Sequence, residues 1–428
     1  MKLRDIFASS TTVVRRVLHL LAQPGRVAHS RDGLVIQPYR GYGSPDELFI
    51  LGRVVAQPTA RSTIQPGALG DLRAILRRVR RRGVPHAVVT AQCGDARQRV
   101  LTDRQGYFRL CLRPTQPLPT DHVWQPVELT VVAPSGATAT GTGSVLVPPP
   151  SARFVVISDI DDTVVLTGVA NKLLMLWRLF AQGAQSRVAF PGVAAFYQAL
   201  YRGPDGAACN PLLYVSRGPW SIYEILDTFF QHHAIPVGPV LVLRDWGLSL
   251  QHPWPRRAPA HKLAVIREMV QRYHALPFVL IGDSGQQDPE LYTQIVREHP
   301  GRVLAIYIRN VSRDAQREQA IAQLAAEVVA AGSSLLLAAD SFAMAEHAAA
   351  HELINPAALA AVLRERVVQQ GAADLQPTHT VGGPQQTTTD AVSAGAVQAA
   401  LATDPDSVTP PNVVIEADPA AGGRDEPA

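Results

Sequence analysis

A short apolar segment that ends in acidic residues constrains the fold of this chain more than any other feature. Residues 153–168 read RFVVISDIDDTVVLTG, and the run from Phe154 to Ile157 is apolar and rich in β-branched side chains. This composition is typical of a strand that is buried on both faces. Asp159 and Asp161 follow at once, so the pattern predicts two carboxylates at the carboxyl end of the strand. In open parallel sheets, ligands bind at this end.

The spacing of the two acids indicates a type of chemistry. Asp159 and Asp161 alternate with Ile160, so in extended chain both carboxylates project to one side. One carboxylate of such a pair can attack phosphorus, while the other protonates the leaving oxygen and later activates water. Like charges so close repel unless a cation intervenes, which predicts an oxygen-liganded metal, most simply Mg²⁺. A calcium loop or an acidic turn is the alternative, but the apolar strand and Thr163 fit an Asp-x-Asp-x-Thr nucleophile motif better.

The patterning along the chain predicts its organisation. A chain of 428 residues with 46% hydrophobic content is too long for one ordinary core. Residues 151–350 alternate apolar strands with helices, which predicts an α/β domain with a doubly wound, mostly parallel sheet. Short alternating strands at 84–150 predict a small β-sandwich-like domain before it. We expect a basic helical or extended region at 1–83, a C-terminal helix at 351–370 and a disordered tail at 371–428.

Composition also bears on location and partners. No apolar run reaches membrane-spanning length, so we expect no transmembrane segment. Arg15, Arg16 and His19 interrupt the apolar core that a secretory signal would need, and the three cysteines have no metal-type spacing. We therefore expect a cytoplasmic protein. Nucleic acid is not an expected partner, because no aromatic residues interleave the arginines between 73 and 82.

Three segments leave peripheral attachment to the inner membrane surface open. Residues 1–30 are a basic amphipathic helix candidate, which either packs on its own domain or binds anionic headgroups. The segment GALGDLRAILRRVRRRG at 67–83 has a cationic face that is either simply solvated or attracted to anionic lipid. The apolar run LLMLWRLF at 173–180 either packs in the core or meets a bilayer.

Further candidate site residues lie at later strand ends and helix starts. Ser216 ends the run LLYVS, and Gly218 helps to turn the chain into a helix whose amino terminus can receive phosphate. Lys262 opens a helix from which its ammonium can reach a phosphoryl group. Asp283 ends the run FVLIGD and is the expected third metal carboxylate. Asp288 is either a further contributor to the metal site or a helix cap.

In this order, SDIDDT, the Ser216 turn, Lys262 and GDSGQQD resemble the four motifs of the haloacid dehalogenase superfamily of phosphotransferases. More closely, SDIDDTV, YVSRGPW, HK and IGDSGQQDPELY resemble the catalytic domain of the actin-patch-protein type of phosphatidate phosphatases. The YRGYG segment near Tyr39 and the β-rich segment are similar to that family's bacterial members. The resemblance covers about residues 30–350 and implies a haloacid-dehalogenase-like sheet for the α/β domain.

The resemblance implies roles for the acidic residues. Asp159 would be the nucleophile and Asp161 the general acid and base. Asp159, the backbone carbonyl of Asp161 and Asp283 would hold Mg²⁺, and Asp288 is counted with these metal-site candidates.

The resemblance also implies a set of substrate-binding residues. Ser216 and Lys262 would bind the phosphoryl group, so that Lys262 is a catalytic candidate as well. Arg217 and Gly218 follow Ser216 where the family usually has a small polar residue and then Asn or Ser. Together with Thr163, they complete the candidate substrate-binding residues.

The implied function is Mg²⁺-dependent hydrolysis of phosphatidate, or a related lipid phosphate monoester, at a membrane surface. The products would be diacylglycerol and phosphate, formed through an aspartyl-phosphate. One alternative is a phosphatase for a soluble phosphorylated metabolite. Another is a non-catalytic membrane or protein binding module. The presence of Asp159, Asp161 and Asp283 argues against it, because an enzyme that had lost its activity would be expected to lose one of these residues.

Overall fold

A computed structural model of the chain describes two β-sheets and the helices that accompany them. The described residues are 33–56, 82–116, 118–119, 122–160, 163, 190–216, 220, 223–242, 258–312, 314–374 and 413–414. The predicted basic segment at 1–30, residues 67–81 of the predicted basic segment 67–83, the apolar run at 173–180 and most of the tail expected to be disordered lie outside the described residues.

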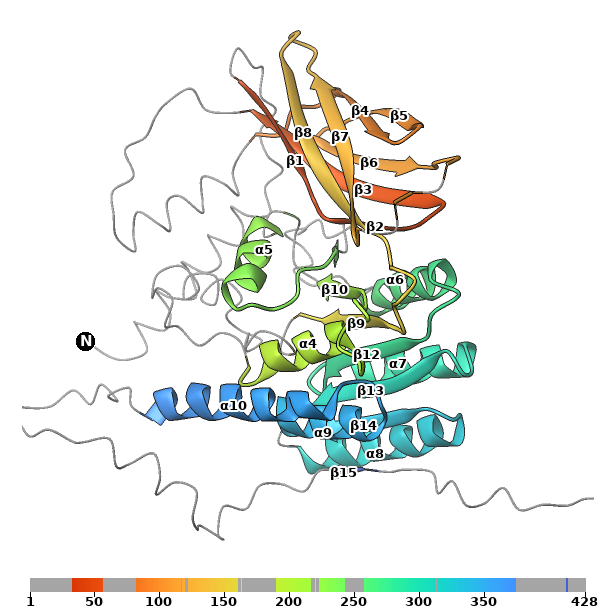
Figure 1. Cartoon of the computed structure of the whole chain (residues 1–428), viewed down its shortest axis with the longest axis vertical. Coiled ribbons are helices and arrows are strands. Elements are labelled where there is room, and N and C mark those ends of the chain that lie inside the picture. Colours follow the sequence, from red (N-terminus) through yellow and green to blue (C-terminus); the bar gives the residue numbers. More distant parts are fainter. Residues whose placement is uncertain are drawn as a thin grey trace, which may run out of the picture.

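Eight strands form the first sheet, drawn in red to yellow in Figure 1. Its order is β1-β3-β2-β8-β7-β4-β5, with β6 paired to β3, and its pairings are antiparallel apart from that of β2 with β8. Along β7, buried and outward-facing residues alternate, as expected for a strand with one face in the core. The strands are β1 (Leu34–Pro38), β2 (Gly41–Ser44), β3 (Glu47–Ala56), β4 (Val88–Cys93), β5 (Ala96–Leu101), β6 (Tyr107–Leu112), β7 (Trp124–Val132) and β8 (Thr138–Leu146).

The first sheet begins earlier in the chain than the segment 84–150 in which the sequence placed it. β1 to β3 lie within the region 1–83, yet they pair with strands of the later segment. Ile50 of β3, Leu110 of β6 and Val127 of β7 are fully buried in one shared core. Residues 34–56 and 88–146 therefore form one structural unit, while the domain boundaries as such stay a prediction.

Seven strands form the second sheet, in the order β11-β10-β9-β12-β13-β14-β15. The pairings from β11 to β14 are parallel, and β15 runs antiparallel to β14. Every residue of β9 is buried, as its apolar composition predicts for a central strand. The strands are β9 (Val155–Asp159), β10 (Leu212–Ser216), β11 (Val240–Val242), β12 (Phe278–Asp283), β13 (Val303–Arg309), β14 (Ser334–Ala338) and β15 (Val413–Val414).

Helices cover both faces of the second sheet. Successive side chains of a strand point to opposite faces, so neighbouring residues of β9 pack in different helical layers. Val156 of β9 packs with α4 (Val193–Arg202), α5 (Tyr223–His232), α9 (Ser341–Ala350) and α10 (Leu359–Asp374). Its neighbour Ile157 packs with α6 (Ala258–Arg272), α7 (Asp288–Glu298) and α8 (Ala315–Ala330). The carboxyl ends of the central strands are thus held between two helical layers.

The prediction of an α/β protein is confirmed: the described chain combines two sheets with helices. The larger sheet is mostly antiparallel, so a doubly wound parallel description does not extend to the whole chain.

Two features of the carboxyl-terminal region differ from expectation. The short 3₁₀ helix η3 (Pro356–Ala358) precedes α10, which continues to Asp374 rather than ending at residue 370. β15 pairs with β14, although it lies in the segment 371–428 that was expected to be disordered. A two-residue strand offers too little periodic pattern to be recognised in a sequence.

Candidate active site

Three neighbouring parallel strands end at one edge of the second sheet. β10, β9 and β12 are hydrogen-bonded neighbours, and their last residues are Ser216, Asp159 and Asp283. All three side chains are buried. The sheet register therefore brings together polar residues that lie far apart in the chain, at the edge where the sequence predicted a site.

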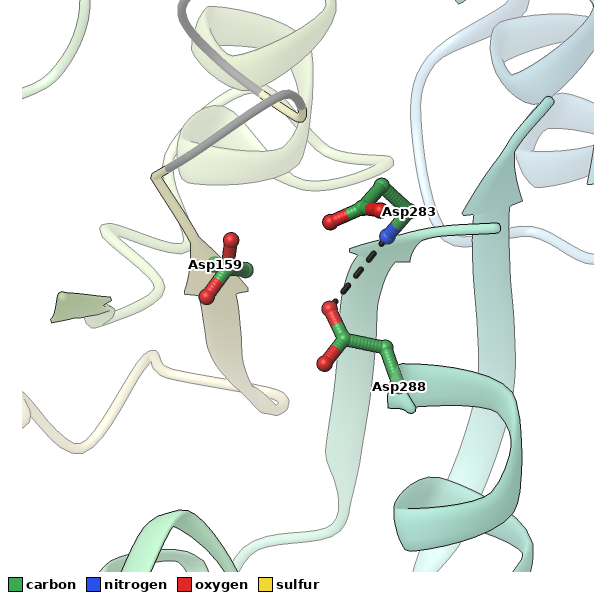
Figure 2. A group of neighbouring side chains, drawn as sticks. All are labelled: Asp159, Asp283 and Asp288. Carbon is green, nitrogen blue, oxygen red and sulfur yellow. Dashed lines mark hydrogen bonds between the residues drawn. The ribbon is translucent and has the colours of Figure 1, made fainter. Parts of the chain in front are cut away.

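Asp159, Asp283 and Asp288 form a buried carboxylate cluster (Figure 2). One carboxylate oxygen from each residue lies within 4.8 Å of those of the other two. Asp288 opens α7, and its Oδ2 accepts a hydrogen bond from the backbone N–H of Asp283 at 3.3 Å. Asp288 is the first residue of α7, whose N-cap position is Gln287, so its carboxylate contacts the cluster and does not cap the helix.

Gly282 makes the close approach of Asp288 to β12 sterically feasible. A Cβ built at residue 282 would lie 2.4 Å from Asp288 Oδ2 and 2.6 Å from Asp288 Cβ. Both distances are shorter than non-bonded atoms tolerate. The glycine before Asp283 is therefore needed for the geometry of the carboxylate cluster, not for a special backbone angle.

Lys262 supplies a buried positive charge to this cluster. From the first turns of α6, its Nζ donates to Asp159 Oδ1 at 2.7 Å and to Asp288 Oδ1 at 2.6 Å. Burial alone lowers the pKa of the ammonium, but the charges and hydrogen bonds of the two aspartates outweigh it, so the pKa of Lys262 is raised. Lys262 is therefore charged at neutral pH and offsets part of the negative charge of the site.

Gln286 also donates to the carboxylates. Its Nε2 lies 2.6 Å from Asp283 Oδ2 and 3.3 Å from Asp159 Oδ2. Arg317 of α8 fixes the loop that contains Gln286, because its guanidinium donates to the backbone carbonyls of Ser284 and Gln286 at 2.8 and 2.7 Å. Gln286 lies inside the GDSGQQD motif but was not among the predicted site residues, because a loop glutamine has no distinguishing pattern in sequence.

Thr163 lies beside a buried arginine that sequence reasoning also missed. Arg309 ends β13, and its Nε donates to the backbone carbonyl of Thr163 at 3.3 Å. Its Nη2 donates to Ser341 Oγ at 2.7 Å, and its guanidinium lies 4.1 Å from the centre of the Phe190 ring. Burial lowers the pKa of Arg309 to about 10, which still leaves it charged. Arg309 therefore connects the end of β13, which lies beyond β12 from β9, to Thr163, four residues after Asp159.

The structure places only some of the predicted site residues. Asp159, Asp283, Asp288 and Lys262 converge, and Ser216 and Thr163 lie buried at the same sheet edge. The three remaining predicted residues lie outside the described part of the chain; they are Asp161, Arg217 and Gly218.

The donor set fits a hard divalent cation. Three buried carboxylates within 4.8 Å of one another offer oxygen ligands only, the type that Mg²⁺ and Ca²⁺ prefer. Lys262 alone cannot balance three carboxylates, so a bound cation would relieve the remaining repulsion. The residues present are therefore compatible with a metal site.

The segment that carries this site matches a known family of catalytic domains. Residues 154–310 match the family model described as the phosphatidate phosphatase APP1 catalytic domain. The matched range runs from β9 through β13 and includes the three carboxylates, Lys262 and Ser216.

Two curated relatives are similar to the same part of the chain. The Phosphatidate phosphatase APP1 of Saccharomyces cerevisiae is 31% identical over 154 residues, which cover 36% of this chain and 25% of the relative. A protein of Schizosaccharomyces pombe described as uncharacterized is 29% identical over 163 residues, covering 37% of this chain and 25% of the relative. The chain thus spans a quarter of the length of these relatives.

Solved structures add no further argument. A carbohydrate acetylesterase from Xanthomonas citri covers 78% of this chain and 73% of its own, at 11% identity and a TM-score of 0.26. A similarity of this size supports no statement about fold or activity. Within the described residues, no helix is long and apolar enough to cross a membrane.

Proposed function

We propose that this chain is a Mg²⁺-dependent phosphatase that hydrolyses phosphatidate, or a related lipid phosphate monoester, to diacylglycerol and phosphate. The observation that carries the proposal is the buried cluster of Asp159, Asp283, Asp288 and Lys262 at the carboxyl ends of parallel strands, inside the segment that matches the phosphatidate phosphatase family. The parallel order of β11 to β14 supports assigning the second sheet to the haloacid dehalogenase fold.

Asp159 is proposed as the nucleophile. A carboxylate oxygen of Asp159 attacks phosphorus, the bond between phosphorus and the glycerol oxygen breaks, and that oxygen takes a proton from Asp161. Asp161 then removes a proton from water, whose oxygen attacks the aspartyl-phosphate and releases inorganic phosphate and free Asp159. The burial of Asp159 supports this role, because a nucleophile enclosed by protein is shielded from competing solvent.

Lys262 and Ser216 are proposed to bind the phosphoryl oxygens. Lys262 already donates to Asp159, so its ammonium lies beside the attacking carboxylate and can reduce repulsion between that group and an anionic substrate. Ser216 would donate its hydroxyl from the neighbouring strand end. Thr163 lies buried nearby, and Arg217 and Gly218 remain candidates for the same role.

Asp159, Asp283 and the backbone carbonyl of Asp161 are proposed to hold Mg²⁺, with Asp288 beside them. When bound, the ion would neutralise charge on the carboxylates and on the phosphoryl oxygens. Gln286 donates to two of these carboxylates, those of Asp159 and Asp283, and would help to orient them.

The lipid part of the proposal depends on the family match, and the associated location is peripheral, on the inner membrane surface. Phosphate release is the direct test, measured from phosphatidate in mixed micelles and from a small aryl phosphate, each with and without Mg²⁺. The wild type is compared with Asp159→Asn and with the exposed control Asp205→Asn.

Turnover of phosphatidate that needs both Mg²⁺ and Asp159 supports the whole proposal. Turnover of the aryl ester alone retains the phosphatase and points to a soluble metabolite. No turnover of either ester by folded, Mg²⁺-loaded protein rejects the enzyme in favour of a binding module.

A further inference from the structure

We propose that the first sheet positions the substrate-binding side of the active site, through contacts between residues 37–40, at the end of β1 and the link to β2, and the start of α5. α5 begins at Tyr223 and is the first described helix after Ser216, the residue assigned to the phosphoryl group. The proposal therefore rests on the proposed phosphatase function. It assigns Tyr39 and Arg40 as positioning residues, which act through Trp220 and α5 rather than on the substrate itself.

Tyr39 packs its ring against the segment that follows Ser216. The rings of Tyr39 and Trp220 are parallel within 4°, with centres 4.8 Å apart. The ring of Tyr223, in the first turn of α5, lies 4.3 Å from that of Tyr39. All three side chains are buried, so this aromatic contact excludes water between the first sheet and α5.

Polar contacts also join residues 37–40 to α5. Arg40 donates from Nε and Nη2 to the two carboxylate oxygens of Asp227, at 2.8 and 3.4 Å, and its backbone N–H donates to Tyr223 Oη at 2.7 Å. Gln37 of β1 donates from Nε2 to Oε1 of Glu224, which lies one helical turn before Asp227 in α5, at 2.7 Å. A two-pronged arginine contact restricts both position and orientation. Rotation or sliding of α5 would break several of these contacts at once.

The first sheet also contacts the helix that carries Lys262. Arg272, in the last turn of α6, donates from Nη1 to Glu47 of β3 at 2.7 Å. Its guanidinium lies 3.7 Å from the centre of the Phe49 ring, also on β3. The two helices next to the proposed phosphoryl-binding residues, α5 and α6, are therefore both braced by the first sheet.

This arrangement predicts a specific kinetic effect. Asp159 and Asp283 are held by the second sheet, and Lys262 is held by Asp159 and Asp288, so none of these groups depends on Arg40. Loss of the Arg40 contact would loosen α5, which Arg40 holds at Tyr223 and Asp227, and weaken substrate binding while leaving the reacting groups in place. KM should rise more than kcat falls.

The test uses the full chain, Mg²⁺ and an aryl phosphate ester. We expect Arg40→Ala to raise KM about fivefold to tenfold with kcat changed less than about twofold. The charge-swapped double variant Arg40→Asp with Asp227→Arg should recover at least part of the lost affinity. Arg297→Ala, which removes an exposed ion pair with Glu327 between α7 and α8, is the matched control and should leave KM unchanged.

Hydrogen exchange supplies a readout that does not require turnover. Peptides covering residues 216–232 should exchange faster in Arg40→Ala than in the wild type or in Arg297→Ala. An unchanged KM, or unchanged exchange in these peptides, would overturn the positioning role.

The proposed function itself fails if the wild type hydrolyses neither phosphatidate nor the aryl phosphate. Binding of inorganic phosphate then decides the positioning role. Weaker phosphate binding by Arg40→Ala than by the wild type supports it, whereas equal binding, or no binding by the wild type, overturns it.

Discussion

Lys262 Nζ donates a hydrogen bond to Asp159 Oδ1 at 2.7 Å, with both side chains almost completely buried. The two residues are 103 positions apart and join the start of α6 to the end of β9. Removing one partner of a buried ion pair leaves the other charge unpaired in a poorly solvated site. Breaking this pair is therefore expected to destabilise the folded protein.

Lys262→Met is expected to destabilise the metal-free protein by about 3–5 kcal/mol, because Asp159 and Asp288 lose their shared cation. Urea unfolding in the presence of a chelator measures this loss. The control is Arg267→Met on the same helix, whose ion pair with Glu298 is partly exposed and should contribute less than about 1 kcal/mol. Equal losses in the two variants would contradict the assignment of Lys262 as the neutralising group.

Gly282→Ala is expected to displace Asp288, since the added Cβ would meet its carboxylate at 2.4 Å. Overpacking at such a site costs about 1–3 kcal/mol, and activity should fall by about tenfold or more. Gly301→Ala is the control, because a Cβ there meets nothing within 4 Å and only its φ of 74° opposes the change. If Gly301→Ala loses stability but keeps activity, the loss of activity in Gly282→Ala comes from the displaced Asp288 and not from lower stability. Full activity in Gly282→Ala would show that Asp288 tolerates displacement.

The strand-end residues of the site could be predicted because their signals are local. Asp159 and Asp283 each follow a short apolar run, and adjacent parallel strands end at the same sheet edge. Lys262 and Asp288 were identified by their places at helix starts, and the structure brings both to the carboxylate cluster. For these residues, periodicity and motif order contain most of the spatial information.

Other parts of the arrangement depend on contacts between distant segments. Gln286 and Arg309 acquire their positions from α8, β13 and the Thr163 loop, which no short sequence pattern brings together. The pairing of β3 with β6, and hence the membership of residues 34–56 in the first sheet, is likewise long-range. The contact of Arg40 with Asp227 spans 187 positions. These features required the tertiary structure.

Asp283→Asn is expected to weaken divalent-cation binding, because it removes one anionic ligand from a cluster of three carboxylates. Thermal unfolding with increasing Mg²⁺ provides the measurement: an ion at 100 times its dissociation constant stabilises the folded protein by about 2.7 kcal/mol. The wild type and the exposed control Asp205→Asn should show this rise, whereas Asp283→Asn should need a much higher Mg²⁺ concentration. The same Mg²⁺ dependence in all three proteins would place the metal elsewhere.

His347 predicts a loss of stability in mild acid. Burial and the charge of nearby His351 lower the pKa of His347 from 6.5 to about 4. Below pH 6.5 the unfolded imidazole binds a proton that the folded one does not, so the free energy of unfolding falls as the pH drops from 6.5 to about 4, by at most about 3 kcal/mol. Urea unfolding across this window should show a shallower pH dependence in His347→Gln than in the wild type, while His274→Gln, an exposed control, keeps the wild-type dependence. The same slope in all three proteins would mean that groups other than His347 determine the acid sensitivity.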